Sequence, residues 1–364
     1  MTIDDIGERS YSLRYYQFYQ CAGKNELRVT ESLMSEAILP TGGVKNVGSL
    51  IRSMVATLRG YWKQANGYQK LLYVIGALLL ASGLFHTGVL IVTDGSLVGP
   101  VSWRKPIVFG LSAGVTLITV GWIMTFLPKH RIRGWLLSGA LGISFLVEVF
   151  LIDMQQWRGV PSHFNFSTPF DAAVFSVMGV LIVLIEIVII VVAVWAFFPL
   201  KTPLSLTWAI RIGMLLQVVG QIFGNLIIQN GVPKVTDPQT GGFIYEAVKS
   251  AYIFGEAGSI KVPHSLTLHA VQVLPVLAFL LLFTNWSESR RLTAVIVAAA
   301  GFTGLVAVSS FQTFSGLALF DMRLLVRLGS GISAVCLIVA YPAALAGLVQ
   351  ARNGPTYALR RPFR

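Results

Sequence analysis

The sequence predicts an all-α fold: a polytopic membrane helix bundle of about eight transmembrane helices with both termini cytoplasmic. Three observations lead to this prediction. Of 364 residues, 54% are hydrophobic and only 12% are charged, whereas a soluble domain carries about 25% charged residues. Several apolar runs reach the ~20 residues that cross a bilayer. These runs are continuous rather than alternating, which favours helices over barrel strands in hydrocarbon.

Residues 1–68 differ in composition from the rest and are expected to form a polar, basic cytoplasmic extension. Its end carries Arg52, Arg59 and Lys63 beside two aromatic residues, a pattern typical of an interfacial helix. A start at Met54 would leave a short basic leader before the first span. The residues before Met54 are therefore expected to be either a loose extension or a product of start-site choice.

Residues 69–352 form the predicted bundle, and residues 353–364 a basic cytoplasmic tail. The expected spans are 71–93, 106–127, 135–152, 172–198, 204–229, 264–284, 292–314 and 330–350. The connections are short except 230–263, in which a weakly amphipathic piece, residues 243–254, is expected along the membrane surface.

Lysine and arginine predict the sidedness, because cytoplasmic loops carry an excess of both. With both termini inside, fourteen of them flank the cytoplasmic ends and eight lie in outer loops, among them Arg104 and Lys105. The expected location is a bacterial inner membrane, with multi-pass topology and membrane lipids as partners. The net charge of +12 is attributed to basic loops, and nucleic acid is not expected as a partner.

Polar side chains of the spans gather at the outer ends in this topology. In chain order they are His86, Arg104, Lys105, Glu148, Asp153, Asp171, Asn225, Gln229, Asn230, His264, His269, Gln272, Gln312 and Thr313. Polar groups in lipid are costly and usually face the bundle interior or a water-filled cavity. The pattern predicts one cavity open to the outer face, and ordinary helix-end residues at an interface are the alternative.

The fifth span carries four amides at every fourth residue: Gln217, Gln221, Asn225 and Gln229. This spacing predicts one slowly turning stripe, either a wall of the polar site or a set of interhelical hydrogen bonds. Gly220 and Gly224 nearby predict close approach of another helix. In the fourth span Glu186 lies at mid-depth, with Arg211 as its expected partner and a proton path as the alternative.

Histidines suggest a second kind of site. His264 and His269 are five residues apart, roughly 140° around a helix, so they are not expected to chelate one metal as an i, i+4 pair does. His86 with His269 is the set expected for haem b or a metal ion. Proton handling, ligand hydrogen bonding and structural roles are the alternatives, and the cofactor is otherwise unknown.

The loop at residues 153–171 is dense in groups that bind polar ligands, which predicts a lid or recognition loop rather than a plain connection. Arg158 and His163 suit a phosphate or carboxylate. His163, Glu148 and Asp153 are the candidate acid–base groups. Sequence motifs for a serine-hydrolase elbow, a phosphate-binding loop, a zinc protease helix and a dinucleotide site are absent.

Three motifs carry a resemblance: QWRGVPSHFN at 156–165, HSLTLHAVQVLP at 264–275 and FQTFSG at 311–316. Over about residues 71–349 the chain resembles a set of uncharacterised bacterial multi-pass membrane proteins. Their pattern has Trp where this chain has Phe311 and Arg where it has Ser315, and Lys261 stands where Arg is expected. The resemblance implies a site built from these motifs and no assigned activity.

The leading hypothesis is an outward-facing polar site that binds or modifies a small or lipid-derived anionic ligand, which leaves open whether the protein is an enzyme. The candidate ligand-binding residues are Arg158, Asn165, Gln221, Asn225, His264, His269, Gln272 and Gln312. A haem- or metal-binding redox protein is one alternative. A transporter, in which the fifth-span stripe continues toward the cytoplasm, is the other.

Overall fold

The computed structural model describes residues 47–353. Two compact units divide the chain: α3 (Val47–Gln64) belongs to one, and residues 65–351 form the other. Helix α3 exposes a stripe of large apolar side chains at helical spacing, Ile51, Val55, Leu58 and Trp62. Basic residues flank this stripe, which is the pattern that an interfacial helix requires.

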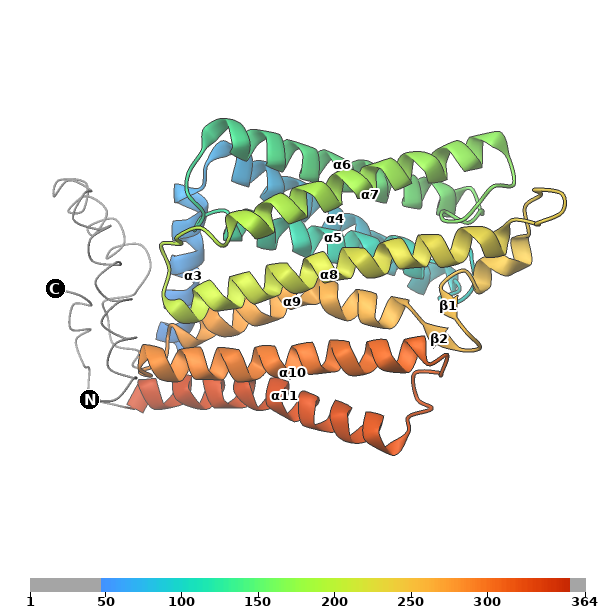
Figure 1. Ribbon diagram of the computed structural model, residues 1–364. Coiled ribbons are helices and arrows are strands. Elements are labelled where there is room, and N and C mark those ends of the chain that lie inside the picture. The colour runs from blue at the N-terminus through green and yellow to red at the C-terminus, as the bar shows by residue number, and fades with distance from the viewer. Residues whose placement is uncertain (1–46, 354–364) are drawn as a thin grey trace, which may run out of the picture. The chain divides into compact units, whose positions relative to one another are not determined.

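The second unit is almost entirely helical. Its elements are α4 (Gly67–Thr93), α5 (Arg104–Ile123), α6 (Arg131–Trp157), α7 (Pro169–Trp195), α8 (Leu204–Val235), η1 (Tyr245–Lys249), β1 (Ile253–Phe254), β2 (Gly258–Ser259), α9 (Lys261–Leu281), α10 (Glu288–Phe314) and α11 (Leu324–Asn353). The helices α4 to α11 are laid alongside one another as a bundle (Figure 1).

Eight helices in the described part of the chain, α4 to α11, are long and apolar enough to cross a membrane. Many large apolar side chains on them stay exposed, such as Val180 at 70% and Ile332 at 67%. Lipid is the solvent that such surfaces need, because water would penalise them. The predicted all-α membrane bundle is confirmed, and the protein is a multi-pass membrane protein.

The helix ends differ from the predicted spans by a few residues. Helix α8 shows one of the largest shifts, since it continues through Pro233 to Val235 rather than ending at residue 229. The segment at 243–254 forms the 3-10 turn η1 and the strand β1, which pairs antiparallel with β2. Side-chain nitrogen Nδ2 of Asn230 donates to the carbonyls of Ala251 at 2.8 Å and Ile253 at 2.9 Å. These bonds tie the segment to α8.

Small residues set the closest helix pairs. A Cβ on Gly114 of α5 would lie 2.7 Å from the Gly76 carbonyl oxygen of α4, so only glycine permits this approach. Helices α8 and α9 lie side by side in the same way (Figure 1). A Cβ on Gly220 would lie 2.8 Å from Thr267 Oγ1. The close approach predicted at Gly220 is therefore present, and α9 is the helix that makes it.

Local signals explain several helix starts. The Asn66 amide N–H donates to Gln69 Oε1 at 2.8 Å, closing a capping box before α4. Thr168 caps α7, because its Oγ1 accepts the Asp171 amide N–H at 3.1 Å, and Pro169 follows at a position where a missing N–H costs nothing.

One end of the bundle carries the two longest structured connections. Helices α6, α8 and α10 end there, and α5, α7 and α9 begin there (Figure 1). We call it the loop end. It corresponds to the outer face of the predicted topology, and that sidedness stays a prediction.

Candidate functional site

Two segments pack together at the loop end: the α6–α7 loop, residues 158–168, and the α8–α9 segment, residues 236–260. The rings of Phe166 and Phe243 join them, with centroids 6.3 Å apart. Phe164 has a left-handed φ of 57° and is only 5% exposed. A non-glycine residue keeps such a backbone only where its surroundings hold it, and here the buried ring packs in the core formed with Phe175 and Ala251.

A group of basic side chains gathers beside this loop. We define the cationic cluster as Arg104, Lys105, His163 and Lys261. Lys105 Nζ lies 3.4 Å from Ser162 Oγ, and Ser162 Oγ lies 3.0 Å from His163 Nδ1. Arg104 and Lys105 are close enough to Lys261 for their charges to interact. The start of α5, the start of α9 and the α6–α7 loop therefore meet at one place.

Lys261 is held in position by an aromatic ring. Its Nζ lies 3.2 Å from the centre of the Tyr252 ring, in the α8–α9 segment. This cation–π contact offsets part of the cost of taking the ammonium group out of water. It supplies no negative charge, however, so it leaves the repulsion between Lys261 and the other cations in place.

His163 is neutral in this environment. Burial lowers its pKa well below the ordinary value of 6.5, and the charges of Lys105 and Lys261 lower it further. Its ring packs against Phe109, with centroids 5.4 Å apart, and Phe175, at 6.3 Å. The imidazole is therefore unprotonated at neutral pH, and the predicted role of His163 in acid–base chemistry stays a prediction.

The cationic cluster lacks an internal counter-charge. The ion pairs among residues 47–353 involve Asp153, Asp171, Glu246 and Glu288, and none of them includes Arg104, Lys105 or Lys261. Cations at a membrane boundary that are partly withdrawn from water are costly unless paired. No carboxylate among the described residues therefore offsets the charge of these cations through an ion pair.

Asp171 is the centre of a second, balanced group in the same region, which we call the carboxylate network. Its donors are Gln155, Arg158, Ser167 and Thr168. Arg158 Nη1 lies 2.6 Å from Asp171 Oδ1, and Gln155 Nε2 lies 2.9 Å from the same oxygen. Thr168 Oγ1 donates to Oδ2 at 2.6 Å. The network fixes the end of α6 to the start of α7.

The geometry gives Arg158 and Asn165 structural contacts. Arg158 is committed to Asp171 and to the Gln155 carbonyl oxygen Oε1, and its guanidinium lies 4.7 Å from the Phe170 ring centre. Asn165 is fully buried; its Nδ2 donates to the Pro161 carbonyl oxygen and its Oδ1 accepts from Ser167. Their predicted ligand-binding roles stay predictions, and a ligand would have to displace these contacts.

His86 belongs to a third group, together with Ser82, Trp103, Asp153 and Trp157. Its Nε2 accepts from Trp157 Nε1 at 3.1 Å, and its Nδ1 lies 2.9 Å from the Ser82 carbonyl oxygen. The ring stacks on Trp103 with a 5.8 Å centroid separation. Asp153 Oδ2 accepts from the Ser82 hydroxyl at 2.8 Å. Both ring nitrogens are occupied, so a metal or haem at His86 would first have to break one of these contacts.

The polar start of α9 is divided among separate partners. His264 Nδ1 lies 2.8 Å from the Gly220 carbonyl oxygen of α8. The Gln272 amide oxygen, in the orientation that satisfies its neighbours, accepts from Thr116 Oγ1 at 3.1 Å. His269 is exposed. These contacts join α9 to α8 and α5, and a cavity shared with His86 stays a prediction.

The fifth-span stripe meets α7 rather than the cationic cluster. Asn225 Nδ2 donates to Glu186 Oε1 at 2.9 Å and to the Gln221 carbonyl oxygen at 3.2 Å. Arg211 is not the partner of Glu186. Its guanidinium donates to the carbonyls at the end of α7, including Ala196 at 3.0 Å.

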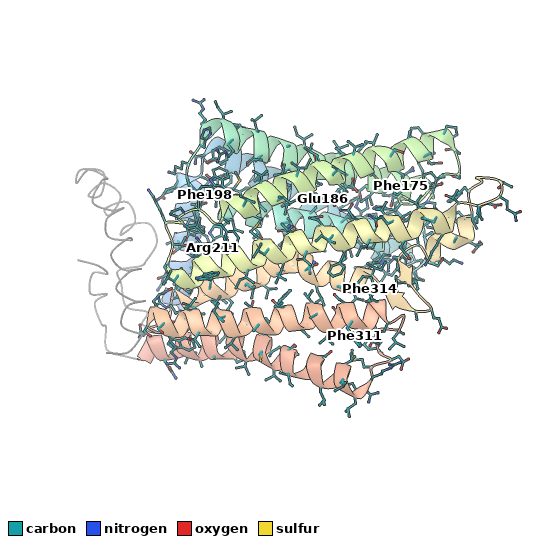
Figure 2. All side chains as sticks on the ribbon, viewed as in Figure 1. Phe175, Glu186, Phe198, Arg211, Phe311 and Phe314 are labelled. Atoms are coloured by element: carbon teal, nitrogen blue, oxygen red, sulfur yellow. The ribbon has the colours of Figure 1, made fainter. Side chains whose placement is uncertain are left out.

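Figure 2 shows the reason. Arg211 and Phe198 lie at one end of α7, whereas Glu186 lies toward the middle of that helix. Ten residues of helix separate Glu186 from Ala196, a rise of about 15 Å, so a direct pair is out of reach. Sequence proximity across a short turn was an insufficient guide, because the helix carries Glu186 away from the turn.

Two remaining predicted residues lie apart. Gln312 Nε2 donates to the carbonyls of Ala318 at 2.6 Å and Asp321 at 2.8 Å, which closes the α10–α11 loop. Glu148 is 1% exposed, and neither carboxyl oxygen has a hydrogen-bond partner in the part of the chain that the structure describes. Its role as a proton acceptor stays a prediction that this isolation supports.

Arg104, Lys105 and Lys261 are not among the ligand-binding residues predicted from the sequence. Their signal was present in the sequence: each opens a predicted span at the same end, and Arg104 and Lys105 oppose the charge bias. What the sequence did not contain was the convergence of Lys105 and Lys261 on His163, because that depends on how α5 and α9 pack.

Neither a metal site among the described residues nor a similar known protein was found. Within residues 47–353, no group of three His, Cys, Asp or Glu side chains is placed to hold a metal ion. The pair His86 and His269 stays a prediction. The chain matches no family model, no curated protein and no solved structure.

Proposed function

We propose that this multi-pass membrane protein binds a small or lipid-derived anion at the cationic cluster, on the outer side of a bacterial inner membrane. The observation that carries the proposal is a neutral His163 beside Lys105 and Lys261, with no ion pair to either lysine among the described residues. Lys105, Lys261 and Arg104 would contact the anion directly.

The chemistry of the donors defines the ligand class. Two ammonium groups and a guanidinium favour phosphate or carboxylate oxygens, since charge-assisted hydrogen bonds are roughly twice as strong as neutral ones. The cluster lies at the ends of membrane-spanning helices, α5 and α9. This is the depth of lipid head groups, so membrane lipids or their derivatives are the natural source of the anion.

Ligand binding to the purified full-length protein tests the proposal. In dodecyl maltoside micelles, thermal unfolding is followed with inorganic phosphate in one arm and dihexanoyl phosphatidylglycerol in the other. Stabilisation by both probes indicates a free-anion site, and stabilisation by the lipid alone indicates a lipid head group. Losing one charge-assisted contact of about 1.5–3 kcal/mol should weaken binding about tenfold to a hundredfold in Lys105→Gln and Lys261→Gln.

Lys249→Gln is the matched control. Lys249 lies in the α8–α9 segment like Tyr252, but it is 62% exposed and paired with Glu246 at 3.1 Å. Its removal should leave binding unchanged. The proposal is wrong if neither probe stabilises the wild-type protein, or if Lys249→Gln weakens binding as much as Lys261→Gln does.

A further inference from the structure

Ser162 occupies a position that the anion site alone does not require. It is 3% exposed, and its Oγ lies between a cation and an imidazole, 3.4 Å from Lys105 Nζ and 3.0 Å from His163 Nδ1. No other serine hydroxyl in the α6–α7 loop contacts an imidazole. Ser167 Oγ, five residues away, donates instead to Asn165 Oδ1 at 2.6 Å and Asp171 Oδ2 at 3.3 Å.

The direction of the hydrogen bonds follows from the donor inventory. An ammonium group only donates, so the Ser162 oxygen accepts from Lys105. In the tautomer with the imidazole hydrogen on Nε2, His163 Nδ1 accepts the Ser162 hydroxyl hydrogen, and this is the tautomer that the reaction requires. Burial and the two lysines lower the pKa of His163, so the imidazole is unprotonated at neutral pH, and the 3.0 Å contact places its Nδ1 within reach of the serine proton.

We propose that Ser162 is the nucleophile of an acyl-transfer reaction on a carboxylic ester of an anionic lipid, with His163 as its general base. This arrangement is a hydroxyl within hydrogen-bond reach of a base, the geometric signature of an activated serine. The inference rests on the proposed anion site, because Arg104 and Lys261 would hold the negative group of the same substrate.

The reaction balances with water as its only co-reactant. Ser162 Oγ attacks the ester carbonyl carbon while its proton passes to His163 Nδ1. The ester C–O bond then breaks, and the alkoxide leaves as an alcohol with the proton from His163. Water attacks the acyl-serine, gives its proton to Nδ1, and releases a carboxylic acid as the proton returns to Ser162.

Two further contacts fit this substrate class. Lys105 Nζ is placed beside the atom that forms the new bond, so it can stabilise the negative charge that develops on the carbonyl oxygen. The rings of Phe109 and Phe175 flank His163 and offer an apolar wall to an acyl chain. The site thus combines a charged side for the head group with a hydrocarbon side.

Covalent labelling tests the proposal without requiring the natural substrate. The wild-type protein in dodecyl maltoside micelles is treated with a fluorophosphonate probe, which reacts with activated serines, and the modified residue is mapped by mass spectrometry. We expect the adduct on Ser162. The absence of an adduct on Ser162 in protein that retains its unfolding transition overturns the proposal, and this readout needs no substituted protein.

Substitutions then assign the roles. Ser162→Ala should abolish the adduct, and His163→Gln should slow labelling about a hundredfold, the contribution of a positioned base. Ser167→Ala, in the same loop, should label at the wild-type rate. Equal labelling rates in His163→Gln and the wild type would exclude His163 as the base and overturn the proposed pair.

The two proposals fail separately. Ser162→Ala keeps Lys105 and Lys261, so it should bind dihexanoyl phosphatidylglycerol within about threefold of the wild-type affinity if the anion site is real. Binding without labelling leaves the anion site standing and removes the nucleophile. Labelling without binding of either anionic probe removes the anion site and the substrate class that depends on it.

Discussion

The carboxylate network and the cationic cluster are built from the same short loop, yet they treat charge in opposite ways. In the first, Asp171 receives donors from Gln155, Arg158 and Thr168, so its charge is matched within the protein. In the second, Lys105 and Lys261 share no ion pair with a carboxylate among the residues described.

This difference separates a structural role from a binding role more clearly than residue type does. Arg158 was the leading ligand-contacting residue in the sequence, and its motif is dense in polar groups. The structure gives Arg158 a carboxylate partner, whereas Lys105 contacts a hydroxyl and Lys261 an aromatic ring, neither of which carries negative charge. A buried charge with its partners present holds the fold together, whereas the proposed anion would supply the charge that the lysines lack.

The largest expected change in stability comes from breaking the carboxylate network. Asp171→Ala removes the acceptor of several donors and leaves Gln155 and Arg158 without their shared partner. The free energy of unfolding should fall by about 3 kcal/mol, the lower end of the range for breaking a buried pair, because Arg158 is itself 39% exposed. Denaturant unfolding of the purified protein measures it. An unchanged midpoint would show that the network does not hold the loop.

Lowering the pH should destabilise the protein through His163 of the cationic cluster. The folded-state pKa of His163 lies below its ordinary value of 6.5, so below that pH the unfolded chain binds more protons than the folded protein. The stabilising contribution of the neutral imidazole is therefore present above pH 6.5 and is lost as the pH falls toward the folded-state pKa. The ligand-free protein should therefore be less stable at pH 5 than at pH 7.5, and the drop measures how far the folded-state pKa lies below 6.5.

Comparison with His163→Gln isolates this effect, because every other titrating group is common to both proteins. Unfolding of the ligand-free proteins at pH 7.5 and pH 5 should show a larger acid loss in the wild type. Bound phosphatidylglycerol should reduce that loss by bringing negative charge to the imidazole. Parallel pH profiles for the two proteins would contradict a neutral, partly buried His163.

The sequence was sufficient for the architecture because membrane crossing is a local property. A run of ~20 apolar residues defines a span wherever it occurs, and all eight spans were predicted within a few residues. The starts of α4 and α7 are equally local, since each cap and its hydrogen-bond partner are three residues apart. Information of this kind does not depend on how the helices pack.

The pairing of polar groups was not available from the sequence, because it is decided by rotation and tilt of whole helices. Glu186 was expected beside Arg211 and instead accepts a hydrogen bond from Asn225. His86 and His269 were grouped by depth alone, whereas Trp157 and Ser82 occupy both nitrogens of His86. Depth predicts which residues share a leaflet, and only packing determines which of them touch.

Removing a positive charge from the cationic cluster should have a smaller effect of opposite sign on the unfolding free energy. Lys105→Met removes one of the repelling cations and keeps a side chain of similar length. The ligand-free protein should gain about 1 kcal/mol in unfolding free energy, as replacing a poorly compensated buried charge often does. The same variant should lose its stabilisation by dihexanoyl phosphatidylglycerol, measured in parallel thermal scans. A destabilised Lys105→Met would show that Lys105 is already satisfied within the protein.

The smallest effect should come from a lysine that has both water and a partner. Lys249 is 62% exposed and pairs with Glu246, which is 78% exposed, and such surface pairs contribute about 0–1 kcal/mol. Lys249→Gln should therefore change the unfolding free energy by less than about 0.5 kcal/mol, within the usual scatter of surface substitutions. The measurement is the same unfolding series used for Lys105→Met. If Lys249→Gln instead matched the gain of Lys105→Met, the gain would come from lowering the net charge of a basic protein, and the position of Lys105 beside His163 and Lys261 would no longer explain it.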